Sequence, residues 1–226
     1  MEEQYCFISD SSIRTLLSGM NVNNSTEGQV LRCAEVIRQG GVCVFPTETY
    51  YGLAVDPFNE VALHVLFQVK GRPELKPVLL LVADRNQLKM VTASVPQVAI
   101  ELMDRFWPGP LTLVLPARPE LSPYITGNTG TVGVRLSPHP VAAALLKTCG
   151  IPLTATSANK SNGKPAVTVG EARSIFGSQV HCVLDGGRSP GKTGSTLVGF
   201  QQGKVVCIRE GSVPFPDILQ AVRQVE

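Results

Sequence analysis

The sequence predicts a single α/β domain built on a twisted, mixed β-sheet with flanking helices. Three observations predict this fold. Helical and strand-like segments alternate early in the chain, strand-like segments follow one another near its end, and no internal repeat interrupts the pattern. Alternation favours parallel pairing and consecutive strands favour antiparallel pairing, so a mixed sheet accounts for both. The composition agrees, because 43% hydrophobic and 17% charged residues are typical of a globular chain.

The N-terminal elements can be assigned from apolar spacing. Residues 1–25 lack periodicity and are expected to form an irregular extension, which leaves residues 26–226 as the domain. Helical spacing begins at Thr26 and ends before Gly40. The apolar run 42–45 predicts a short buried strand.

The same two periodicities define the remaining elements. Further helices are expected at residues 60–69, 97–106, 138–148 and 168–176, and from about residue 216. Strands are expected at 78–82, 111–115, 131–136, 152–156, 180–184, 196–200 and 205–208. Asp84 is positioned to cap a short helix, and Thr168 with Glu171 forms a capping box.

Charge and hydropathy exclude some classes of protein. The net charge of +2 lacks the basic excess of a dedicated nucleic-acid binder, although a local basic groove is compatible with it. No apolar run approaches the ~20 residues that span a bilayer, so no membrane partner is expected. The acidic N-terminus, with Glu2 and Glu3, does not resemble a basic leader, which favours a cytoplasmic protein.

The six cysteines predict neither a zinc site nor a disulfide framework. No two form a CxxC pair, and the three histidines stand apart in the sequence. Cys43, Cys182 and Cys207 lie in apolar, strand-like runs, where buried, reduced thiols are expected. Reduced thiols agree with a cytoplasmic protein.

Three loop segments carry more polar groups than a simple connection needs. Residues 46–53 read PTETYYGL, which fits either a capped turn or a hydroxyl-rich binding loop. Lys70 and Arg72 follow a helix, where they either offset its negative end or bind an anion. Ser157 and Asn159 leave a strand, in an ordinary turn or as hydrogen-bond donors to a ligand. Ser157 is not expected to be a nucleophile, because no GxSxG surrounds it.

Two arginines could serve a cleft. Thr131, Gly133 and Arg135 alternate along a strand and therefore share one face. On a solvated face an arginine is unremarkable, whereas in a cleft it becomes a carboxylate ligand. Arg209, directly after an apolar strand, carries the same ambiguity.

Residues 186–193 match the P-loop pattern literally, but the match is judged coincidental. A P-loop must be followed by a helix whose amides hold phosphate. Here residues 196–200 are strand-like, and Pro190 removes an amide donor from the loop.

The polar segments occur together and in order, and in this combination the sequence resembles the YrdC family of threonylcarbamoyl-AMP synthases. The resemblance extends from about residue 27 to about residue 212. It rests on PTETYYGL at 46–53, KGRP at 70–73, FWPGPLT at 106–112, TVGVRLSPHP at 131–140, SAN at 157–159, DGG at 185–187 and ST at 195–196. The family usually has Val at Tyr50, Gly at Ala54, Pro at Thr156 and often Glu at Gly194, so individual substrate contacts differ more than the class of reaction.

The resemblance implies a fold and a reaction. The fold is a single-domain, YrdC-like twisted mixed sheet around a concave, basic cavity, with residues 26–226 as the catalytic domain. The reaction joins L-threonine, bicarbonate and ATP into L-threonylcarbamoyl-AMP and releases pyrophosphate, for the threonylcarbamoyladenosine modification of tRNA. Because the sequence ends at residue 226, the C-terminal domain of longer family members is not expected.

The resemblance also implies roles for individual residues. ATP is expected against Lys70, Arg72, Thr131, Ser157, Asn159 and Arg209, of which Lys70, Arg72, Ser157 and Asn159 act in catalysis. Threonine is expected against Thr47, Arg135, Ala155 and Ser195, with Arg135 binding its carboxylate. Mg²⁺ is expected to accompany ATP without a protein-ligated metal. A threonylcarbamoyl transferase would receive the product, and tRNA or double-stranded RNA is a candidate partner.

Three alternatives remain at this point. A related enzyme on the same fold would form a carbamoyl adenylate from carbamoyl phosphate. A non-catalytic RNA-binding module would use the cavity as a basic groove, although only 6% of residues are aromatic and stacking platforms are therefore few. A P-loop NTPase ranks third, and it would depend on Lys192 rather than Lys70.

Overall fold

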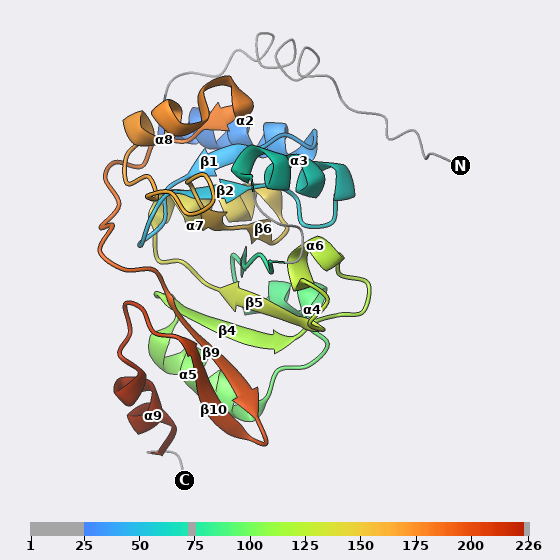
Figure 1. Cartoon of the computed structure of the whole chain (residues 1–226), viewed down its shortest axis with the longest axis vertical. Coiled ribbons are helices and arrows are strands. Elements are labelled where there is room, and N and C mark those ends of the chain that lie inside the picture. The colour runs from blue at the N-terminus through green and yellow to red at the C-terminus, as the bar shows by residue number, and fades with distance from the viewer. Residues whose placement is uncertain (1–24, 72–75, 224–226) are drawn as a thin grey trace.

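The fold is a mixed α/β arrangement in which two β-sheets lie next to each other, each with helices packed on it (Figure 1). The computed structural model describes residues 25–71 and 76–223. The expected N-terminal extension, up to residue 24, and Arg72 lie outside the described residues. The α/β class is confirmed, and the strands form two mixed sheets rather than one.

The first sheet has four strands in the order β7-β2-β1-β8. Its strands are β1 (Cys43–Phe45), β2 (Gly52–Ala54), β7 (Thr156–Ser157) and β8 (Cys182–Val183). Strand β1 pairs antiparallel with β2 and parallel with β8, and β2 pairs antiparallel with β7. The PTETYYGL loop and the Ser157 segment therefore meet at one side of this sheet.

The second sheet has six strands in the order β10-β9-β4-β5-β3-β6. Its strands are β3 (Leu80–Leu81), β4 (Leu111–Pro116), β5 (Thr131–Arg135), β6 (Leu153–Thr154), β9 (Thr196–Gln201) and β10 (Lys204–Arg209). Two pairs are parallel, β3 with β5 and β4 with β9, and the others are antiparallel. Because a strand follows the P-loop-like segment where a P-loop needs a helix, that segment is not a P-loop.

Helices cover both sheets (Figure 1). The longer ones are α2 (Thr26–Arg38), α3 (Glu60–Lys70), α5 (Gln97–Phe106), α7 (Pro140–Cys149), α8 (Val169–Phe176) and α9 (Phe215–Arg223). Helices α2 and α7 pack together, as do α5 and α9. The short helices are η1 (Arg85–Gln87), α4 (Leu88–Val91), α6 (Pro123–Thr126) and η2 (Gly177–Gln179).

Local sequence explains where the helices begin and end. The Ser25 hydroxyl accepts a hydrogen bond from the Gly28 amide at 3.2 Å and caps α2. Helix α3 ends at Lys70, and the residue that caps it, Gly71, has a φ of 59°, a left-handed conformation that glycine adopts without strain. The predicted capping box forms in part, since the Thr168 hydroxyl accepts from the Glu171 amide at the start of α8, while the Glu171 carboxylate accepts from the Val167 amide rather than from the Thr168 amide.

The core consists of two apolar clusters with β1 between them. Val44 belongs to one cluster, and its neighbours Cys43 and Phe45 belong to the other. Alternate side chains of a strand point to opposite faces, so β1 is buried on both faces, as its continuous apolar run indicates. No helix in the described part of the chain is long and apolar enough to cross a membrane.

The cysteines correct two expectations. Cys43 is buried as expected, and burial raises the pKa of its thiol well above the usual value. Cys182 was expected to be reduced, but it forms a disulfide with Cys33, a residue 149 positions away on α2. Cys207 was expected to be buried but is exposed, because β10 is the edge strand of its sheet.

Candidate functional site

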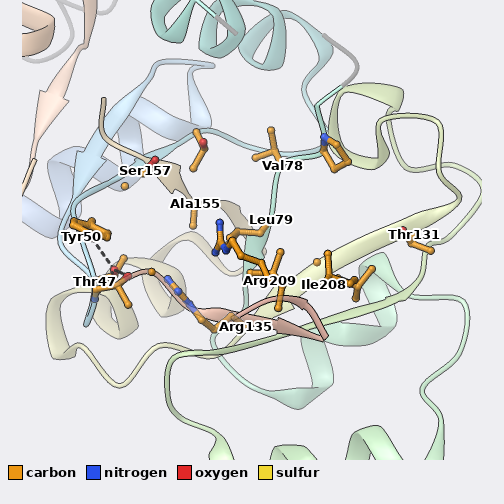
Figure 2. Close-up of a pocket in the computed structure, with 18 of the residues that line it drawn as sticks. Thr47, Tyr50, Val78, Leu79, Thr131, Arg135, Ala155, Ser157, Ile208 and Arg209 are labelled. Carbon is orange, nitrogen blue, oxygen red and sulfur yellow. Dashed lines mark hydrogen bonds between the residues drawn. The ribbon is translucent and has the colours of Figure 1, made fainter. Parts of the chain in front are cut away.

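A cavity of about 420 Å³ lies between the two sheets (Figure 2). Its volume falls within the range of small-molecule sites, roughly 300–1,000 Å³. The first sheet contributes the loop before β2 and the strand β7, and the second contributes β4, β5, β9 and β10. Six of the ten expected site residues line it: Thr47, Thr131, Arg135, Ala155, Ser157 and Arg209.

Strand β5 forms one wall of the cavity. Thr131, Gly133 and Arg135 all line it, so the predicted shared face is confirmed. A Cβ atom on Gly133 would lie 3.3 Å from the Thr112 methyl and 3.5 Å from the Leu79 Cβ. Because glycine has no side chain, no atoms project from this position into the cavity.

The PTETYYGL loop forms the opposite wall as a tight turn. The Thr47 hydroxyl donates to the Tyr50 carbonyl at 2.7 Å and accepts from the Thr49 amide at 3.2 Å (Figure 2). Tyr51 is fully buried, and its hydroxyl donates to the Gly187 carbonyl at 2.6 Å. These bonds fix the turn, so Thr47 presents a fixed oxygen to the cavity.

Two arginines make the cavity suitable for anions. Burial lowers the pKa of Arg135, and the neighbouring charge of Arg209 lowers it further, while Glu48 opposes both effects. Burial also lowers the pKa of Arg209, whose guanidinium donates to the Ser195 carbonyl at 2.9 Å. Both remain cationic near neutral pH, because the guanidinium is so strongly basic that arginine is not deprotonated in proteins. A ligand with negative charge would offset their mutual repulsion.

Lys70 lies behind the cavity rather than in its lining. It is 3% exposed, and its ammonium donates to the Ser157 carbonyl at 2.5 Å, the Asn159 side-chain oxygen at 3.0 Å and the Asn159 carbonyl at 3.2 Å. The Ser157 hydroxyl donates to the same Asn159 oxygen at 2.6 Å. Lys70 therefore holds the SAN segment in place in this structure.

Ser195 also lies outside the lining. It is 2% exposed, and its hydroxyl accepts from the Thr112 hydroxyl at 2.8 Å. Its carbonyl holds Arg209, so it contacts the cavity through that side chain. The structure thus brings Lys70, Asn159 and Ser195 next to lining residues without placing them at the surface of the cavity.

The apolar part of the lining was not predicted from the sequence. Val114, Leu197 and Ile208 line the cavity on the side of the second sheet, and Leu79 lies in the cavity wall (Figure 2). Ile208 is 55% exposed although its strand reads as uniformly apolar. The feature that could have indicated this exposure was the position of Ile208 next to Arg209, on a strand at the edge of the sheet. Such a surface suits the flat, apolar face of a nucleobase or similar group.

The described cavity lining contains no carboxylate, so it offers no acidic ligand set for a metal ion. The described cysteines Cys33, Cys43 and Cys182 have sulfur atoms within 4.8 Å of one another, which their spacing in the sequence did not indicate. None of the three lines the cavity, and two of them form the disulfide.

Known proteins resemble this chain over most of its length. A family model, Sua5_yciO_yrdC, described as "Telomere recombination", matches residues 35–211. The threonylcarbamoyl-AMP synthase of Bacillus subtilis is 38% identical over 193 residues, or 84% of this chain and 55% of that protein. The protein of the same name from Thiobacillus denitrificans is 38% identical over 187 residues, or 83% of this chain and 99% of that protein.

Solved structures share the fold. The structure of Pyrococcus abyssi Sua5 complexed with L-threonine matches with a TM-score of 0.83 at 34% identity, over 86% of this chain and 57% of that one. Escherichia coli YciO matches with a TM-score of 0.75 at 25% identity, over 85% of this chain and 94% of that one. The chain thus spans little more than half of the Bacillus and Pyrococcus proteins and nearly all of the Thiobacillus protein.

Proposed function

The chain belongs to the Sua5/YciO/YrdC family, and from this we propose that it synthesises L-threonylcarbamoyl-AMP from L-threonine, bicarbonate and ATP, with release of pyrophosphate. The observation that carries the proposal is the cavity, in which Arg135 and Arg209 face one hollow beside the fixed Thr47 turn. A site for this reaction must hold a carboxylate and a phosphate chain close together, and two cationic side chains on one cavity meet that need.

The reaction needs positioning more than covalent participation of the protein. The threonine amine and bicarbonate combine to a carbamate with loss of water. A carbamate oxygen then attacks the α-phosphorus of ATP, and the bond to the β-phosphate oxygen breaks to release pyrophosphate. Holding the carbamate and the α-phosphate in line and offsetting the charge that develops supply the catalysis.

We assign the threonine side of the cavity to the first sheet and the nearby arginine. Arg135 binds the threonine carboxylate, and the Thr47 oxygen and the Ala155 backbone bind its polar groups. Ser195 contributes through its carbonyl contact with Arg209. The Pyrococcus abyssi structure with L-threonine supports placing an amino acid in this fold.

The nucleotide extends from Ser157 toward Thr131. Thr131, Ser157 and Arg209 bind it directly, and Lys70 and Asn159 support Ser157 from behind. Arg72, outside the described residues, completes the phosphate site in this proposal. Mg²⁺ enters with the nucleotide phosphates, because the described lining has no carboxylate to hold it. The product passes to a threonylcarbamoyl transferase that modifies tRNA.

The test is a direct assay of the reaction. The pure protein is incubated with ATP, bicarbonate and labelled threonine, and pyrophosphate release and an acid-labile threonine adenylate are measured. We expect both products only when threonine is present. Release that depends on carbamoyl phosphate instead would assign the related carbamoyl-adenylate activity. RNA affinity that falls steeply with salt, without any turnover, would assign an RNA-binding module.

A further inference from the structure

Glu48 stands in the middle of the PTETYYGL loop, yet it does not line the cavity. Its side chain is 12% exposed and lies on the far side of Arg135, which does line the cavity. A carboxylate in that position contacts no ligand directly. It can act only through the residues that it holds.

Glu48 contacts two residues at the end of strand β5, its last residue Arg135 and Ser137 two positions beyond it. One carboxylate oxygen accepts a hydrogen bond from the Ser137 hydroxyl, and the other lies 3.3 Å from the Arg135 Nε. Arg135 and Ser137 are two positions apart on an extended segment, so their side chains point to the same side. The Ser137 oxygen also accepts from the His139 amide at 3.2 Å, which anchors the hydroxyl in turn.

At the Nε atom of its guanidinium, Arg135 has Glu48 as its ion-pair partner among the described residues. Neither the Glu48 oxygen nor the Arg135 Nε has a hydrogen-bond partner among the described residues, and the Arg135 side chain is 4% exposed. A buried charge without an opposite charge nearby is strongly unfavourable. Arg209 adds a second positive charge, so Glu48 is the group that keeps Arg135 in its place.

The orientation of the guanidinium follows from this contact. The Nε atom lies 3.3 Å from the Glu48 oxygen, and the two terminal nitrogens lie at the opposite end of the group, near Thr47 (Figure 2). A terminal pair of N–H donors in a fixed plane matches the two oxygens of a carboxylate. Arg135 is therefore oriented for a carboxylate before any ligand binds.

We infer that Glu48 is a positioning residue, which orients Arg135 for the carboxylate of the amino-acid substrate. The inference rests on the proposed function, since it takes threonine as the ligand of Arg135. It assigns no catalytic role to Glu48, because that side chain does not reach the cavity. It predicts that Glu48 controls the affinity for threonine and leaves the affinity for ATP unaffected.

The decisive variant is Glu48→Gln. The amide can still exchange a hydrogen bond with the Ser137 hydroxyl, but it carries no negative charge, so the variant loses the ion pair with Arg135. We expect the KM for threonine to rise about tenfold and the KM for ATP to stay within about twofold, the scale for one lost charged contact. The control is Glu171→Gln, which alters one carboxylate bond to the Val167 amide outside the cavity.

A second variant covers the case in which Glu48→Gln fails to fold. Ser137→Ala removes one hydroxyl and leaves the ion pair intact, so a smaller rise in the threonine KM, about threefold, is expected. An unchanged or lower threonine KM in a folded Glu48→Gln protein would overturn the inference. Equal rises in both KM values would also overturn it, because they indicate a general structural defect.

Calorimetric titration with threonine separates this inference from the proposed function. It compares the threonine Kd of the wild type and of Glu48→Gln without requiring turnover. A wild type that binds threonine but releases no pyrophosphate would refute the proposed function, and the two Kd values would still decide on Glu48. A wild type that binds no threonine would overturn both.

Discussion

Replacing Lys70 by methionine tests whether this lysine supports the site from behind. Methionine has a similar length and no charge, so the change removes the ammonium and little volume. The contacts that the variant loses include those to the carbonyl and hydroxyl oxygens of Ser157 and to both oxygens of Asn159. The Ser157 carbonyl keeps the Asn159 amide as a donor at 2.9 Å, and the Asn159 side-chain oxygen keeps the Ser157 hydroxyl at 2.6 Å.

In the variant, the Asn159 carbonyl is the one of these carbonyl and amide oxygens left without a donor among the described residues. The loss of that donor sets the expected change in the free energy of unfolding. A buried, unsatisfied carbonyl costs about 1–3 kcal/mol. The variant loses the favourable charged contacts of the ammonium and also the unfavourable cost of burying that charge. These two contributions to stability largely cancel. We therefore expect Lys70→Met to lower the free energy of unfolding by about 2 kcal/mol and to disorder Ser157, with loss of ATP-dependent product.

The assay is urea denaturation followed by circular dichroism, together with pyrophosphate release. Lys147→Met, at an exposed position on α7, is the matched control and should leave both values unchanged. A Lys70→Met protein as stable as the wild type but inactive would refute the supporting role. Lys70 would then act on the ATP phosphates alone.

Three further perturbations probe the cavity wall, the half-buried His139 and the disulfide. Gly133→Ala should retain most turnover, since its Cβ would meet Leu79 at an ordinary 3.5 Å and the Thr112 methyl at 3.3 Å, which a shift of a few tenths of an ångström relieves. Gly133→Leu fills the cavity and should reduce turnover at least about tenfold in the pyrophosphate assay. Burial lowers the pKa of His139 below 6.5, so the unfolded chain binds more protons and stability should fall from about pH 7.5 to 5.5. His139→Gln should flatten that decline in urea denaturation, and an unchanged slope would contradict this cause. Reducing the Cys33–Cys182 disulfide, which closes a loop of 149 residues, should lower the unfolding free energy by up to about 5 kcal/mol. The Cys33→Ser, Cys182→Ser double variant should show no response to dithiothreitol, and a response there would refute the assignment.

Elements with strong local signals were predicted well. Helix α5 has the predicted bounds, because apolar spacing and the proline before it define it without tertiary contacts. Strand β3 is shorter than the predicted 78–82, because only Leu80 and Leu81 find partners on β5 and β6. Helix α6 was missed, since four residues are too few to show a period.

One wall of the cavity was predicted from strand periodicity. Strand alternation placed Thr131, Gly133 and Arg135 on one face, and the structure places that face in the cavity. Lys70 was expected to contact phosphate, and its contacts with the SAN segment could not be foreseen, because they join positions 87 and 89 residues apart. Glu48 was part of a recognised motif, but its partner on β5 became visible only through the packing of the two sheets.

Because the cavity lies between the two sheets, a bound substrate would affect the stability of the whole fold. Its opposite walls, at the loop that holds Thr47 and at Thr131 on β5, come from the two different sheets, so a ligand that contacts both would link them. A bound nucleotide or amino acid would then stabilise the folded protein by a free energy that grows with the logarithm of the ratio of ligand concentration to Kd. At 100 times Kd this amounts to about 2.7 kcal/mol, so a melting curve alone can rank candidate ligands.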